Sequence, residues 1–64
     1  MGKIRRAGFI FLFWKGDHSP RHVHVYRGGR LVLKWNLDAR VAMQGVPTAR
    51  VLELIAALEK ERKL

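Results

Sequence analysis

The stretch Phe9-Ile10-Phe11-Leu12-Phe13-Trp14 decides how this chain folds. Successive side chains of a β-strand point to opposite faces of a sheet, so the phenylalanines share one face and Ile10, Leu12 and Trp14 share the other. Because both faces are apolar, we expect a central strand that is covered on both sides. A C-terminal helix can cover one face, and a second copy or a partner protein can cover the other. We expect Trp14 and Trp35 to lie in the core, with contact to a partner as the alternative.

A β-hairpin is predicted next, because residues 22–26 and 31–37 alternate polar and apolar side chains on either side of Gly28-Gly29. A two-residue Gly-Gly loop would place Arg27 opposite Arg30, and such a like-charge pair destabilises a sheet. A three-residue loop that begins at Arg27 instead gives the second glycine the left-handed position that this turn needs. We therefore predict the longer loop.

The longer loop pairs the strands in a definite register, in which His24 lies opposite Val32 and His22 lies opposite Lys34. This register places apolar and polar side chains on opposite faces of the hairpin. One face holds Val23, Val25, Leu31, Leu33 and Trp35, and the other holds His22, His24, Tyr26, Arg30 and Lys34.

A single helix is predicted at the C-terminal end, with Pro47 in its first turn and Thr48 as its cap. Residues 36–44 form a connector with room for an edge strand. We predict one α+β domain over residues 1–64, in the order β-β-β-α, with a three- or four-stranded antiparallel sheet and the helix packed on it. The helix would bury a stripe with helical spacing, formed by Val51, Leu54, Ile55 and Leu58.

Size and composition limit the stability and the chemistry of the chain. It has 64 residues and no cysteine, which excludes disulfides and thiolate metal sites. A core this small rarely supplies more than about 3–5 kcal/mol, so we expect a homodimer or a complex with a small acidic partner. The lack of cysteine fits the cytoplasm. The apolar run at residues 8–14 is too short to span a bilayer, so no membrane partner is expected.

Positive charge is concentrated in the first two thirds of the chain. The formal net charge is +8, and residues 1–40 carry nearly all of it. Such a charge favours polyanions or an acidic protein. The basic residues of this part outnumber the acidic ones by seven, with Lys3, Arg5, Arg6, Lys15, Arg21, Arg27, Arg30, Lys34 and Arg40 against Asp17 and Asp38.

All three histidines lie within the segment 17–26, and three interpretations of them compete. In the first, His22 and His24 are the catalytic acid and base of a metal-independent RNA cleavage, because imidazole titrates near neutrality. In the second, the His-x-His pair binds a metal with His18 or Asp17, although the surrounding cations disfavour this. In the third, the histidines are structural residues on a sheet face that contacts a partner protein.

The other candidate binding residues surround these histidines. We expect RNA rather than DNA, because Tyr26 can stack on an unpaired base. Arg21, Arg30 and Lys34 would hold the phosphate and stabilise the charge that builds on it. No cofactor is expected.

The chain resembles a family known as domain of unknown function 4160. The residues that carry the resemblance are the aromatic strand from Gly8 to Trp14, the segment His18-Ser19-Pro20-Arg21-His22-Val23-His24-Val25, Gly28-Gly29 and Lys34-Trp35-Asn36-Leu37. Members are short bacterial and archaeal proteins that are often encoded beside another small domain. The resemblance therefore implies a component of a toxin–antitoxin-like module.

Overall fold

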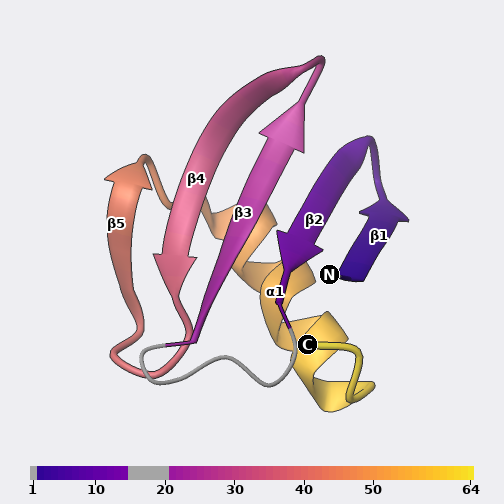
Figure 1. Ribbon diagram of the computed structural model, residues 1–64, viewed down its shortest axis with the longest axis vertical. Helices are drawn as coiled ribbons and strands as arrows, with labels where there is room; N and C mark the ends of the chain where they lie inside the picture. Colours follow the sequence, from indigo (N-terminus) through magenta and orange to yellow (C-terminus); the bar gives the residue numbers. More distant parts are fainter. Residues whose placement is uncertain (1, 15–20) are drawn as a thin grey trace.

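Five antiparallel strands and one helix make up the fold of the computed structural model, which describes residues 2–14 and 21–64 (Figure 1). Every strand pairs with its neighbour in the chain. The α+β class and the C-terminal helix are confirmed, and the sheet has more strands than the three or four expected. The elements are β1 (Gly2–Arg6), β2 (Phe9–Phe13), β3 (His22–Arg27), β4 (Arg30–Asn36), β5 (Val41–Gly45) and α1 (Ala49–Lys60).

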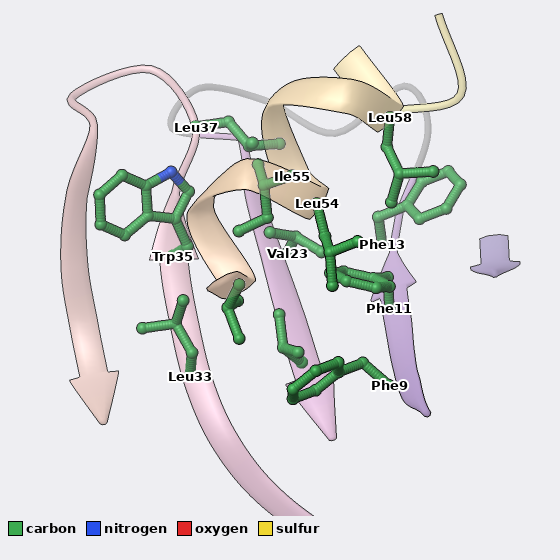
Figure 2. Packing of buried hydrophobic residues seen from close by; sticks show 12 residues of the cluster. Phe9, Phe11, Phe13, Val23, Leu33, Trp35, Leu37, Leu54, Ile55 and Leu58 are labelled. Carbon is green, nitrogen blue, oxygen red and sulfur yellow. The ribbon is translucent and has the colours of Figure 1, made fainter. Parts of the chain in front are cut away.

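The core lies between α1 and one face of the sheet (Figure 2). Phe11 of β2 and Leu58 of α1 are both fully buried, so the phenylalanine face of β2 packs under the helix as predicted. Burial of such side chains stabilises the fold by about 1.5–3 kcal/mol each. The buried helix residues are the four that the helical spacing predicts, Val51, Leu54, Ile55 and Leu58.

The hairpin between β3 and β4 has the shorter loop, so the predicted register is wrong. Arg27 lies directly opposite Arg30, and Tyr26 lies opposite Leu31. A β-bulge then leaves Val32 without a partner across the hairpin, and this residue packs against the core. A bulge places two residues opposite one and shifts the pairing that follows by one position.

Most side chains nevertheless lie on the predicted faces, because the bulge compensates for the shorter loop. His24 lies opposite Lys34 and His22 lies opposite Asn36, whereas Val32 and Lys34 were expected there. Two apolar residues differ from the predicted faces: Leu31 shares the side of Tyr26, and Val32, which was predicted opposite His24, packs against the core.

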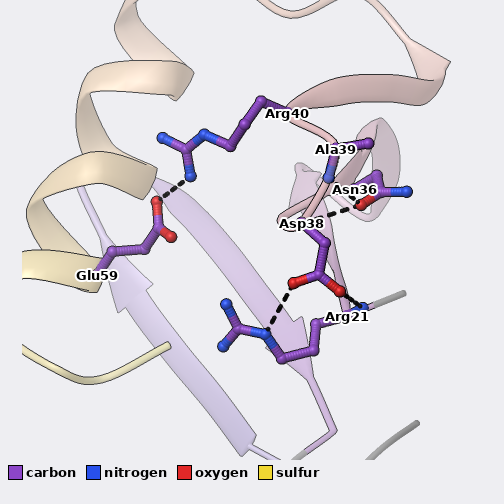
Figure 3. Close-up of polar contacts among 6 residues, drawn as sticks. All are labelled: Arg21, Asn36, Asp38, Ala39, Arg40 and Glu59. Carbon is purple, nitrogen blue, oxygen red and sulfur yellow. Dashed lines mark hydrogen bonds and ion pairs between the residues drawn. The ribbon is translucent and has the colours of Figure 1, made fainter. Parts of the chain in front are cut away.

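The ends of α1 are defined by local contacts. The side chain of Thr48, the predicted cap, accepts a hydrogen bond from the backbone N–H of Val51. Near the other end, the Arg40 guanidinium lies 2.6 Å from a Glu59 carboxylate oxygen (Figure 3). In residues 2–14 and 21–64 no helix has the length and apolar character that crossing a membrane requires.

Candidate nucleic-acid interface

The side of the sheet that faces away from α1 is covered by no helix or strand of the described residues, and we call it the open face (Figure 1). Alternation along the strands places basic, aromatic and apolar side chains on it. Its members are Lys3, Arg5, Ile10, Leu12, Trp14, His22, His24, Tyr26, Leu31, Lys34, Asn36, Val41 and Gln44.

One row of the open face crosses all five strands. Each residue of the row lies directly opposite the next, in the order Lys3, Leu12, His24, Lys34 and Gln44. Directly opposite Cβ atoms are about 4.5–5.5 Å apart. The row therefore brings a histidine next to one lysine and about two strand spacings from a second.

Three rings form a cluster at one end of the open face. The ring centroids of His22 and His24 are 5.3 Å apart, and that of Trp14 lies 5.1 Å from His24 and 5.9 Å from His22. Edge-to-face geometry prevails, with interplanar angles of 77° between Trp14 and His24 and 70° between the two imidazoles. Such contacts fix the rings relative to one another. The two predicted catalytic residues are thus neighbours.

The pKa of His24 lies below its ordinary value of 6.5. Burial of the imidazole is the largest cause, and the positive charge at His22 and Lys34 adds to it. Its Nδ1 atom is buried and has no hydrogen-bond partner in the part of the chain that the structure describes. His24 is therefore neutral at neutral pH and can accept a proton from a substrate.

Arg21 lies just before β3 and is bound to the turn after β4 (Figure 3). Its backbone N–H donates to Asp38 over 2.9 Å, and its Nε donates to the same carboxylate over 3.3 Å. The side chain of Asn36 shapes this turn, because its Oδ1 accepts hydrogen bonds from the backbone of Asp38 and Ala39. A phosphate at Arg21 would have to share the guanidinium with Asp38.

The remaining predicted binding residues lie apart from the histidines. Tyr26 stands between Ile10 and Leu31 on the open face, beyond Leu12 and its row. Arg30 lies opposite Arg27, whose guanidinium carbon is 5.3 Å from the centroid of the Phe9 ring on the helix side of the sheet. The face predicted for Arg30 is therefore wrong, because the short loop turns this residue away from His24.

Metal binding gains no support from the residues that can be placed. No group of three or more His, Asp or Glu side chains converges within residues 2–14 and 21–64. His18 and Asp17, the expected further ligands, lie outside the described residues. His22 and His24 alone make a two-ligand set, and structural zinc sites use four.

Sequence reasoning missed two parts of this surface. Trp14 was expected in the core, yet 38% of its surface is exposed, because no helix or strand of the described residues covers the face of β2 that it shares. Lys3 and Arg5 belong to the open face through β1, which was not predicted as a strand. The alternation of Lys3, Ile4 and Arg5 is the signal that could have indicated it.

An antiparallel sheet with one helix below it and a histidine–tryptophan cluster above it defines a small α+β protein. The chain belongs to the family described as Domain of unknown function (DUF4160), whose model matches residues 8–63. The match confirms the resemblance found in the sequence, and β1 precedes the matched region. No curated protein and no solved structure matches the chain significantly.

Proposed function

We propose that this protein binds RNA through its open face, as a cytoplasmic component of a toxin–antitoxin-like module. The observation that carries the proposal is the position of Lys34 directly across from His24, beside the rings of His22 and Trp14. A cation beside exposed rings can bind both parts of a nucleotide, because the cation pairs with the phosphate and the base stacks on the rings. The net charge of +8 attracts the polyanion from a distance.

Cleavage of the bound RNA is the catalytic form of this proposal. His24, neutral at neutral pH, removes the proton from a ribose 2′-hydroxyl, whose oxygen then attacks the adjacent phosphorus. His22 donates a proton to the departing 5′-oxygen, so that a cyclic phosphate and a 5′-hydroxyl result. Lys34 stabilises the extra negative charge on the phosphate in the transition state.

Salt-dependent binding tests the RNA interface. We compare the wild type with Lys34→Ala and with Lys60→Ala, which removes the same charge from the exposed end of α1. Fluorescence anisotropy with a labelled single-stranded RNA gives the dissociation constant over a range of salt. Lys34→Ala should lose one phosphate contact, which lowers the magnitude of the slope of log K against log salt by about 0.7. Lys60→Ala should not lower this slope. Equal slopes in the two variants would contradict the proposal.

Cleavage is tested with the same RNA in the presence of a chelator. Wild type, His24→Gln and His22→Gln are incubated with it, and the products are resolved on a gel. Loss of either proton-transfer group should slow cleavage about 10²–10⁴-fold. Equal cleavage by all three proteins, or cleavage by none, removes the catalytic form and leaves binding in place.

A non-enzymatic interaction module is the second candidate. A shallow groove of about 320 Å³ on the open face favours it, because Ile10, Leu12 and Tyr26 line the groove and Lys3 flanks it. An acidic partner with an apolar side chain would fit such a surface. This candidate predicts that Leu12→Lys abolishes co-purification with a neighbour-encoded acidic protein while RNA binding stays measurable. Retained co-purification would count against it.

A further inference from the structure

A pocket of about 250 Å³ opens beside the aromatic cluster, where the sheet ends next to the C-terminal end of α1. We call it the foot pocket. Phe13 and Leu37 give it an apolar floor, and Trp14 and His22 form its aromatic wall. Two arginines, Arg21 and Arg62, complete the lining together with Leu64.

The tryptophan of the wall is open to a ligand. Trp14 is 38% exposed, which is unusual for an indole in a chain whose other tryptophan, Trp35, is 7% exposed. The rings of Trp14 and His22 lie at an interplanar angle of 33° to each other, and both residues line the pocket. A flat aromatic ligand can therefore stack on the indole.

Arg62 supplies the positive charge. It forms no ion pair within the described residues, whereas the guanidinium of Arg21 is engaged by Asp38. The position of Arg62 is set by the way α1 ends. The backbone N–H of Arg62 donates to the carbonyl of Glu59, and the N–H of Lys63 donates to the carbonyl of Leu58. These two bonds form a Schellman motif, which directs the chain back toward the sheet.

The motif places Arg62 at a position where glycine is usual. Its φ is +60°, in the left-handed region that side chains rarely adopt. A residue held in such a conformation costs stability, and residues of this kind concentrate at binding sites. The arginine at this turn is thus unfavourable for the helix end, and it lines the foot pocket.

We propose that the foot pocket binds one unpaired nucleobase of single-stranded RNA, stacked on Trp14, with an adjacent phosphate at Arg62. This inference rests on the proposed RNA binding and names the kind of RNA. A volume of about 250 Å³ lies below the ~300–1,000 Å³ of pockets for larger ligands and leaves room for a single ring system. Paired bases of an A-form duplex cannot be splayed into such a pocket, so single strands are selected.

Fluorescence and binding measurements test the foot pocket together. Because Trp35 is buried, quenching of tryptophan emission by an added ligand reports on Trp14. The probes are a single-stranded RNA, a duplex RNA of the same length and a nucleoside monophosphate. Loss of one stacking contact weakens binding about 5- to 150-fold. Trp14→Ala should bind single-stranded RNA more weakly by this factor, whereas Trp14→Tyr should bind it almost as well as the wild type does. Neither variant should change the affinity for the duplex.

Arg62→Gly separates binding from stability. Glycine relieves the left-handed turn, so this variant should melt at a higher temperature than the wild type while it binds single-stranded RNA more weakly. A purely structural role for Arg62 would leave RNA affinity unchanged. Lys60→Ala serves again as the control for the loss of one positive charge in the same region.

The outcomes distinguish the two proposals. RNA binding that is equal in wild type, Trp14→Ala and Arg62→Gly would overturn the foot pocket, and a salt slope still lowered in Lys34→Ala would leave phosphate binding by the open face intact. Quenching by the monophosphate without any RNA binding would overturn the RNA proposal and support the pocket as a nucleotide site. Absence of both signals would overturn both.

Discussion

Arg27 and Arg30 lie directly opposite each other at the tip of the β3–β4 hairpin. The pairing follows from the two-residue Gly28-Gly29 loop, in which both glycines have positive φ values, 60° and 78°. Contact of the Arg27 guanidinium with the Phe9 ring, at 5.3 Å from the centroid, offsets part of the repulsion between the arginines. The turn geometry thus prevails over an unfavourable charge pair.

Replacing one of these arginines with an acid should stabilise the protein. Arg30→Glu turns a like-charge pair into an opposite-charge pair, and cross-strand pairs of this kind contribute about 0.2–1 kcal/mol. Urea denaturation measures the free energy of unfolding. Arg5→Glu is the matched control, because it makes the same change in net charge opposite Ile10. The idea fails if the two variants are equally stable.

Gly45→Ala should disrupt the pairing of β4 with β5. The φ of Gly45 is +85°, and a Cβ there would lie 2.2 Å from the carbonyl oxygen of Val32. Gly28→Ala is the comparison, since Gly28 also has positive φ but open space around it. The left-handed conformation alone costs about 1–2 kcal/mol, so Gly45→Ala should cost clearly more than Gly28→Ala. Thermal melting of both variants checks this, and equal losses would argue against a close approach of the two backbones.

Acid should weaken the fold through Glu61. Its pKa is lowered from 4.5 to about 2, chiefly by the hydrogen bond from Arg6, with N–O distances of 2.6 and 2.9 Å. The folded state therefore holds fewer protons than the unfolded state, so the stabilisation is present above pH 4.5 and is lost as the pH falls toward 2. Both side chains are partly exposed, and salt should reduce the effect.

Melting curves of the wild type and Glu61→Gln between pH 7 and pH 2 measure this contribution. The difference in melting temperature should disappear at the acid end. Glu53→Gln is the control, because Glu53 forms no ion pair in the described part of the chain. A difference that persists at pH 2 would mean that the glutamine acts through something other than charge.

His24 should titrate below 6.5 in the folded protein. The neutral imidazole is favoured on folding, so its contribution to stability is complete above pH 6.5 and is lost as the pH falls below that value. NMR titration of the ring protons gives the midpoint directly. Because burial is the largest cause, the pKa should stay below 6.5 in Lys34→Ala and in His22→Gln, while rising in both. An ordinary midpoint in the wild type would refute the burial of this ring.

The sequence was sufficient to predict the elements with strong periodicity. Residues 9–13 alternate apolar residues on two faces, and α1 has its buried stripe at helical spacing, so both were placed correctly. β5 was foreseen only as a connector with room for an edge strand, because all five of its residues are exposed and no buried face imposes a pattern. β1 was missed for a similar reason, since Ile4 is its only large apolar residue.

The register and the candidate site were harder to predict. The short loop reversed the faces of Leu31 and Arg30, and the bulge at Val32 that restores the predicted faces beyond it has no sequence signature. His22, His24 and Lys34 were placed on one face correctly, because alternation survives the compensating shift. The foot pocket depends on Arg62, whose position follows from how the helix ends, and periodicity carries no information about that turn.

The strand order has a consequence for how the chain is made. Each strand pairs with the one synthesised just before it, so the sheet can assemble in the order in which residues leave the ribosome, and its loops close rapidly. The covering helix emerges after all five strands, and until then the phenylalanine face has no protection from water. A chain that terminates before residue 49 is thus a substrate for proteases, which limited proteolysis of such a fragment can establish. The core is therefore completed only when the helix has followed the strands.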